Sequence, residues 1–361
     1  MHGSSAGCSG SFSAFLLVLL VANAMAAAPA SAFHDGGTAT CEVCHVMHGE
    51  QDGPVMLDGG DPMLTAGTAT DVCLACHGGQ HGVFGHNPLA PPRERGAGNF
   101  VFLLEDNLND APDGFSRPIA GEAAGHSVVS VEMGTAADSR WTTAPGGDFP
   151  SAALGCTSCH DPHGNGNFRM LHGEGEVQGG LFEFLYPAPD ASGVDCCSVG
   201  ASESRLNHSA YRGGMSMWCA NCHGMYHDED DTAFEHPVDE NLDDDIARTY
   251  RRYNGSSDPF GGDEAMAYLT AVPFESPTST VDRTDGPDAS DEIMCLSCHR
   301  AHASSAPASG RWDFNVGLLQ LDGMVSGSWR LPNPYRDRDQ GPLCQKCHGL
   351  SIGDHDDMHG D

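Results

Sequence analysis

Aromatic residues and basic residues are both scarce in this sequence of 361 residues, and each scarcity excludes something. Aromatics make up only 7% of the chain, while Gly (46) and Pro (22) are abundant, so a large self-packed core of helices or sheets is not expected. Lys and Arg number 17 against 50 Asp and Glu, which gives a net charge of −33. This acidity argues against nucleic acid and anionic lipid as partners.

Long apolar runs are also lacking, apart from one near the N-terminus. Residues 15–22 read FLLVLLVA and are followed by Ala30-Ser31-Ala32, a small-residue site typical of signal-peptide cleavage. Residues 1–32 contain no Lys or Arg, which is unusual for such a signal. We nevertheless interpret residues 1–32 as a signal peptide cleaved after Ala32, so that the protein is secreted. We expect no transmembrane segment elsewhere in the chain.

Cysteine, by contrast, is abundant, and 12 of the 15 cysteines lie in six CxxCH motifs. The motifs are CEVCH (41–45), CLACH (73–77), CTSCH (156–160), CANCH (219–223), CLSCH (295–299) and CQKCH (344–348), here called the first to sixth motifs. Bare CxxC pairs could form zinc ribbons, but zinc does not require the histidine that follows every pair. Covalent haem attachment does require it, because the cysteines bond the haem and the histidine ligates the iron.

The motifs therefore predict six covalently bound haem c groups. The predicted attachment cysteines are Cys41, Cys44, Cys73, Cys76, Cys156, Cys159, Cys219, Cys222, Cys295, Cys298, Cys344 and Cys347. The predicted proximal iron ligands are His45, His77, His160, His223, His299 and His348. We expect residues 33–361 to form a single hexahaem cytochrome domain, mostly coil with short helices and 3-10 turns, little sheet, and the haems as its core.

The second axial ligand decides whether such a haem carries electrons or transforms a substrate. Thirteen further histidines remain in the mature chain, so all six irons can be bis-His ligated, which favours electron transfer. His48, His163 and His302 each follow a proximal histidine by three residues, and His227 follows one by four. A histidine one helical turn later cannot reach the opposite face of the same ring, so we expect it to serve another haem. His355 and His359, in the acidic tail, are expected to be solvated.

Two features outside the motifs leave alternatives open. Cys196 and Cys197 are adjacent, and they form a vicinal disulfide, pair between chains, or stay unpaired. The acidic clusters Asp228–Asp231 and Asp243–Asp245 either bind Ca²⁺ through carboxylate oxygens or form a solvated face.

Several long strings resemble a known family of filament-forming hexahaem c-type cytochromes, the extracellular cytochrome nanowires. The strings are FHDGGTATCEVCHVMH (33–48), TTAPGGDFPSAALGCTSCHDPHG (142–164), GMSMWCANCH (214–223), AYLTAVPFE (267–275) and MCLSCHRAHAS (294–304). The resemblance implies six stacked bis-His haems and head-to-tail polymerisation. It also implies that His48 ligates the fifth haem of the next subunit. Eight distal candidates have counterparts in the family: His34, His48, His86, His126, His163, His227, His236 and His302.

We accordingly expect a secreted electron conduit that polymerises with itself and delivers electrons to other redox proteins or to acceptors such as metal oxides. We do not expect an enzyme. The alternatives are a monomeric surface or periplasmic electron-transfer cytochrome, and a multihaem reductase with one open haem. Because the net charge is −33, assembly is expected to need salt, divalent cations or mild acid.

Overall fold

The computed structural model describes twelve stretches of the chain. They are residues 40–46, 64–79, 82–85, 96–107, 121–194, 208–227, 238–254, 258, 260–269, 272–279, 285–311 and 345–348. Several predicted features lie outside them: the signal peptide 1–32, His34, His48, His86, His236, Cys344, the Cys196–Cys197 pair, Asp228–Asp231, His355 and His359. For His227 the structure describes the backbone alone.

The regular secondary structure of the described residues consists mainly of short helices. The α-helices are α2 (Cys41–Cys44), α3 (Ala69–His77), α4 (Met215–His223), α5 (Asp243–Arg252), α6 (Glu264–Ala267), α7 (Cys295–Cys298) and α9 (Gln345–His348). The 3-10 helices are η1 (Phe100–Asn107), η2 (Gly121–Ala123), η3 (Ser151–Ala153), η4 (Cys156–Ser158), η5 (Phe168–Met170), η6 (Gly224–His227) and η7 (Pro307–Ser309).

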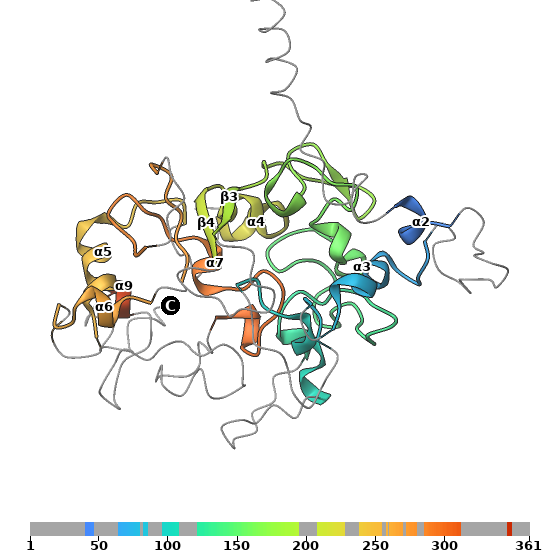
Figure 1. Ribbon diagram of the computed structural model, residues 1–361, viewed down its shortest axis with the longest axis horizontal. Coiled ribbons are helices and arrows are strands. Elements are labelled where there is room, and N and C mark those ends of the chain that lie inside the picture. Colours follow the sequence, from blue (N-terminus) through green and yellow to red (C-terminus); the bar gives the residue numbers. More distant parts are fainter. Residues whose placement is uncertain are drawn as a thin grey trace, which may run out of the picture.

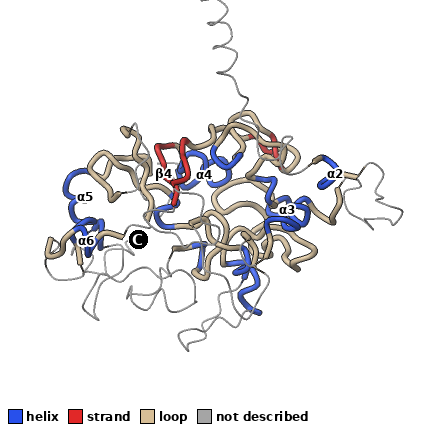
Figure 2. Tube along the Cα trace, in the orientation of Figure 1, coloured by secondary structure: helices blue, strands red, loops and turns tan. Residues whose placement is uncertain are grey.

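Sheet is confined, in the described stretches, to two antiparallel pairs of strands. The strands β1 (Val177–Gln178) and β2 (Phe182–Glu183) form one pair, and β3 (Asp190–Val194) and β4 (His208–Gly213) form the other. Loops connect everything else, as Figure 2 shows. The predicted fold class, mostly coil with short helices and little sheet, is confirmed.

The motif-bearing helices follow the long axis of the molecule in sequence order. In Figure 1, α2 lies at one end, α3 comes next, α4 and α7 lie in the middle, and α9 lies at the other end beside α5 and α6. Every one of these short helices except α5 and α6 carries residues of a CxxCH motif. The chain thus lays its motifs out as a row. Within the described stretches, no helix combines the length and apolar character needed to cross a bilayer.

Within the described stretches, three small apolar clusters take the place of a single large core, and each lies beside a motif. The first cluster packs Leu74 of α3 against Phe84, Phe102 and Ala303. The second comprises Tyr250, Tyr253, Leu269 and Val272, with Cys347 of α9 packed against it. The third comprises Met215 of α4 with Met294 and Leu296 at α7. With few aromatics available, the apolar side chains are divided among separate clusters, and each cluster supports a motif.

Two glycines show why the chain is rich in this residue. A Cβ added at Gly147 would lie 1.9 Å from the carbonyl oxygen of Cys222, in the fourth motif. A Cβ added at Gly125 would lie 2.4 Å from the carbonyl oxygen of His302. Both positions bring a backbone segment into direct contact with a predicted haem-binding residue, so no side chain fits there.

Candidate haem sites

The motifs adopt two backbone forms. In the first and fifth motifs a four-residue helix spans the two cysteines, and the histidine then leaves in extended conformation: φ is −120° at His45 and −111° at His299. The third motif is similar, with the 3-10 helix η4 ending before His160 and His160 paired with Leu171 in a β-bridge. In the second and fourth motifs the histidine instead closes a nine-residue helix, α3 or α4.

This difference corrects one step of the sequence argument. The three motifs in extended form are those followed by a histidine three residues later, namely His48, His163 and His302. The motif helices end before His160 and His299, so His163 and His302 do not lie one turn further along the same helix. Each of them faces a histidine of another motif instead.

A backbone hydrogen bond fixes the ring of several motif histidines. Nδ1 of His160 lies 2.9 Å from the carbonyl oxygen of Arg169, Nδ1 of His223 lies 2.7 Å from that of Pro145, and Nδ1 of His299 lies 2.8 Å from that of Ala308. A carbonyl only accepts, so Nδ1 carries the proton in each ring and donates it. Nε2 then carries the lone pair that would ligate a haem iron, as in other metal-binding histidines.

Three pairs of histidines face one another across a space that fits an iron atom. The ring centroids of His45 and His163 are 6.1 Å apart, with planes inclined by 11°. Those of His160 and His302 are 6.5 Å apart, and those of His126 and His223 are 6.0 Å apart. An iron bound by two imidazole nitrogens at about 2 Å each leaves ring centroids roughly 6 Å apart. The residues therefore fit bis-His haems at the first, third and fourth motifs.

The distal candidates His126 and His302 are half-buried, and both are held in the form that binds metal. Burial lowers the pKa of His126 to about 4 and that of His302 to about 3, so both rings are neutral at pH 7. Nδ1 of His126 donates to the carbonyl oxygen of Ala301, at 2.7 Å, which leaves Nε2 to face His223. His302 packs against the ring of Phe100, with centroids 4.5 Å apart.

Neighbouring motifs lie with their first cysteines side by side. The side chains of Cys73 and Cys156 are adjacent, and the amide of Cys156 donates to the hydroxyl of Thr70, at 3.4 Å. The fourth and fifth motifs repeat this arrangement: the side chains of Cys219 and Cys295 are adjacent, and the amide of Cys295 donates to Ser216 Oγ at 3.2 Å. The second and third motifs, and the fourth and fifth, therefore form two equivalent pairs that bring their haem attachment points together.

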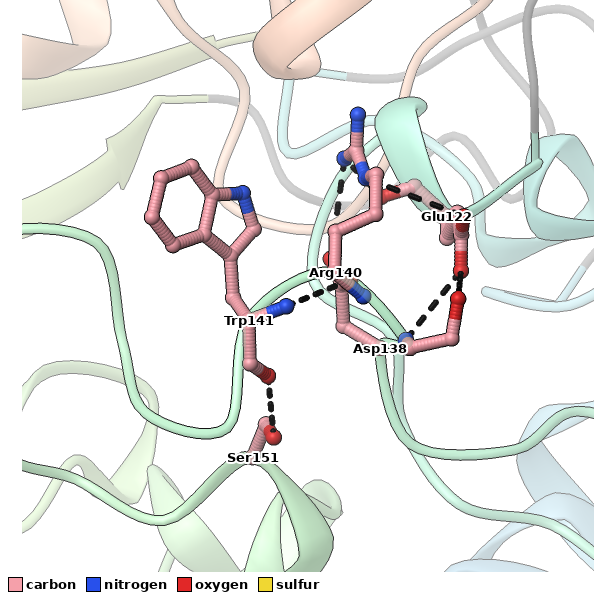
Figure 3. Close-up of polar contacts among 6 residues, drawn as sticks. Glu122, Asp138, Arg140, Trp141 and Ser151 are labelled. Carbon is pink, nitrogen blue, oxygen red and sulfur yellow. Dashed lines mark hydrogen bonds and ion pairs between the residues drawn. The ribbon is translucent and has the colours of Figure 1, made fainter.

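A polar network stabilises the loop that serves the fourth motif (Figure 3). Arg140 donates to the carbonyl oxygen of Glu122 at 2.9 Å, and the hydroxyl of Ser139 donates to the Glu122 carboxylate at 2.6 Å. These Ser139 hydrogen bonds hold the pKa of Glu122 below its usual value. The Trp141 side chain points away from the network, while its carbonyl accepts from Ser151 Oγ at 2.6 Å. The network anchors both His126, just after η2, and the turn that carries Pro145.

Sequence reasoning left out the role of His172. Its Nε2 donates to the carbonyl oxygen of Thr157 at 3.0 Å, and its ring is buried, so this histidine closes the turn after the third motif. No sequence signal identifies this residue, because its place beside Leu171, which pairs with the proximal His160, follows from the fold. The pairing of distal histidines with particular motifs was likewise not visible in the sequence.

The exposed cluster Asp243–Asp245 forms the first turn of α5. Asp243 Oδ1 accepts from the amides of Asp245 and Ile246, each at 2.9 Å, and Asp245 pairs with Arg248 at 2.6 Å. These contacts are those of a capped helix start. Calcium binding at this cluster stays a prediction.

Comparisons with known proteins agree with this architecture. The doubled CXXCH motif family matches residues 149–178, around the third motif. The C-type cytochrome OmcS of Geobacter sulfurreducens (strain ATCC 51573 / DSM 12127 / PCA) is 31% identical, over 92% of this chain and 98% of its own length. Its structure as the outer membrane cytochrome S filament aligns with a TM-score of 0.68, at 28% identity, covering 88% of this chain and 99% of that one. A second structure, of the OmcS nanowires, gives 0.69 at 27% identity with the same coverage.

Repeated CxxCH motifs, histidines fixed at Nδ1 and a coil-rich fold define a multihaem c-type cytochrome with covalently bound haem c. Haem iron held between two histidines accepts and releases single electrons when bound. Within that class the chain belongs to the OmcS family.

Proposed function

We propose that this cytochrome carries electrons along a row of six bis-His haems and polymerises into a secreted, extracellular conductive filament. The observation that carries the proposal is the spacing of the three histidine pairs at 6.0–6.5 Å, which leaves no coordination position for a substrate at the first, third and fourth motifs. Likeness to the OmcS filament and nanowire structures supports the polymeric form. The protein thus acts as a conduit rather than as an enzyme, with residues 33–361 as one hexahaem unit after loss of residues 1–32.

The pairing of the distal histidines predicts that one haem takes its ligand from a neighbouring subunit. His163, after the third motif, faces His45 of the first, and His302, after the fifth motif, faces His160 of the third. The proximal histidine of an extended-form motif is therefore paired with the histidine that lies three residues after the next motif of this form. By this rule the fifth motif requires a histidine that follows a further motif of the same form, whereas the sixth motif, the CxxCH that follows it in the sequence, ends in a helix, α9. His48, which follows the first motif, is the remaining histidine of this kind, and we assign it to the fifth haem of the next subunit.

The other two haems draw on the remaining candidates. With His126, His163 and His302 placed in pairs, the second and sixth motifs take their distal ligands from among His34, His86, His227 and His236. Other redox proteins or extracellular acceptors such as metal oxides would receive the electrons at the filament surface.

The cross-subunit assignment is tested with His48→Ala and a matched control, His163→Ala. Both variants should keep six covalently attached haems and show one additional high-spin haem per protomer by electron paramagnetic resonance. Filaments should disappear from negative-stain images of His48→Ala alone, because His163 serves a haem of its own chain. Filaments that persist in His48→Ala would overturn the assignment. Monomers in the wild-type preparation would favour the monomeric cytochrome, and high-spin haem in the wild type would favour a reductase.

The conditions of assembly provide an independent test. A net charge of −33 per chain opposes polymerisation at low ionic strength, since exposed charges are then poorly screened. Light scattering should therefore report assembly on addition of salt, divalent cations or mild acid. Equal assembly at millimolar ionic strength and neutral pH would contradict this expectation.

A further inference from the structure

Three carboxylates that no haem motif contains meet beside the fourth and fifth motifs. Glu275 and Glu292 are directly opposed in an antiparallel bridge, with hydrogen bonds of 3.0 and 2.8 Å between their backbones. Asp239 joins them on the segment that leads to Asn241, which is itself bridged to Glu292. One carboxylate oxygen from each of the three lies within 4.8 Å of one from each of the others. Like charges directly opposed on a strand pair are destabilising unless something compensates them.

Within this group, the carboxylate of Glu275 is the one that water cannot stabilise. Its side chain is fully buried, at 0% exposure. One carboxylate oxygen accepts from the amide of Met215, the first residue of α4, at 2.6 Å. The other oxygen, Oε2, is buried and has no hydrogen-bond partner among the described residues. A buried acceptor left without a donor or cation costs free energy, so its retention calls for a ligand.

The electrostatics of the group point in the same direction. Burial, reinforced by Asp239 and Glu292, raises the pKa of Glu275 to about 7. Burial and Asp239 also raise the pKa of Glu292. Both shifts report a site in which several negative charges oppose one another, and a positive ion between them removes the conflict.

We propose that Asp239, Glu275 and Glu292 bind a divalent cation, Ca²⁺. An oxygen-only ligand set whose atoms lie within 4.8 Å of one another suits a cation with metal–oxygen distances of about 2.3–2.6 Å and a flexible coordination shell completed by water. Mg²⁺ is a poorer match because it demands a near-ideal octahedron and gives up its water shell reluctantly. Asp239 is exposed and Glu292 half-buried, so water and the ion can reach the site from one side.

The location gives this cation a structural role. Glu275 holds the first amide of α4, the helix that ends in the fourth motif. Glu292 lies three residues before Cys295, where the fifth motif begins. A bound cation would tie together the segments that enter two neighbouring haem motifs. It would also offset negative charge beside their haems, which raises the reduction potential.

The test uses the purified holocytochrome after treatment with a chelator, titrated with CaCl2 in a calorimeter. Wild-type protein should bind Ca²⁺ at one such site and gain thermal stability from it. Asp239→Asn and Glu292→Gln alter the accessible ligands, leave the buried Glu275 in place, and should each weaken binding at least about tenfold. Asp148→Asn is the matched control: it removes one exposed carboxylate outside the trio and outside the Asp243–Asp245 cluster, and should bind as the wild type does.

Three results would overturn the proposal: no calcium binding by the wild type, binding unaffected by both site variants, or equal loss in the Asp148→Asn control. A titration with MgCl2 that gives equal affinity would overturn the choice of Ca²⁺. Loss of the Ca²⁺-induced rise in melting temperature in both site variants, together with its retention in the control, would support the site independently of calorimetry.

Discussion

The segments 156–172 and 295–311 share one turn, although few of their residues match outside the CxxCH motif. In each, the proximal histidine donates from Nδ1 to the carbonyl nine residues later, Arg169 or Ala308. Both turns also hold two consecutive non-glycine residues at positive φ: 52° and 57° at Arg169 and Met170, and 56° and 56° at Ala308 and Ser309. The same backbone thus recurs because both turns must present a carbonyl to a histidine ring.

The side chains that finish the two turns differ. His172 closes the first turn by donating from Nε2 to the carbonyl oxygen of Thr157, at 3.0 Å, and Arg311 closes the second by donating from Nε to that of Leu296, at 2.6 Å. The histidine that leaves each turn also differs in surroundings. The His163 side chain is 80% exposed, whereas His302 is half-buried and packs against other rings. The first turn therefore places its distal histidine, His163, on the surface, and the second places His302 against the interior.

The largest difference between the two turns should appear when their distal histidines are removed. His302→Ala leaves a cavity in a packed region and should lower the free energy of unfolding by about 3 kcal/mol, as large-to-small core changes do. His163→Ala should cost much less stability because its side chain is exposed. Both should produce one high-spin haem. Thermal unfolding followed by Soret absorbance measures the first effect, and equal destabilisation in the two variants would break the comparison.

Removal of the closing side chains should have the next largest effect. Arg311→Ala deletes a buried, charge-assisted hydrogen bond and should cost about 2 kcal/mol, whereas His172→Ala deletes a neutral one and should cost about 1 kcal/mol. Chemical denaturation with absorbance at the haem band provides the measurement. His172→Ala should leave the number of low-spin haems unchanged, since this ring is not assigned to an iron. A new high-spin signal in that variant would contradict its structural role.

The residue after each proximal histidine should give the two haems different reduction potentials. Asp161 follows His160, whereas the buried Arg300 follows His299 and donates to the carbonyl oxygen of Gly96 at 2.9 Å. A buried positive charge favours the reduced haem, so Arg300→Met should lower one potential by some tens of millivolts. Asp161→Asn should raise another by less, because that carboxylate is partly solvated. Spectroelectrochemical titration resolves the direction, and a rise in Arg300→Met would refute the assignment.

The smallest effect is expected at the strained positions themselves. Ala308 lies at φ 56°, where an L-residue costs about 1–2 kcal/mol relative to the right-handed region. Ala308→Gly removes that cost but gains freedom in the unfolded chain, so a net stabilisation of about 0.5 kcal/mol is expected. Ala306→Gly, at φ −112°, is the control and should destabilise instead. The melting temperatures of both variants are compared with that of the wild type in one buffer. A lower melting temperature for Ala308→Gly would contradict the prediction.

Most of the haem chemistry was predictable because its determinants are local. Cys156, Cys159 and His160 lie within five residues, and no fold is needed to recognise what they attach. The coil-rich architecture followed from scarce aromatics and abundant glycine. The backbone form of the motifs was not predictable, since Leu171, Thr157 and Arg169 reveal their part in holding His160 only when the turn is closed.

The sequence by itself determined the cofactor, its number and the class of protein, because covalent attachment depends on residues adjacent in the chain. Only the tertiary structure decided which histidines face each other, since His160 and His302 are far apart in sequence and their approach depends on packing around Phe100. It alone also brought Asp239, Glu275 and Glu292 together. In each case the physical reason is the same: an axial ligand or a cation site needs atoms within a few ångströms, and for distant residues that proximity is set by the fold.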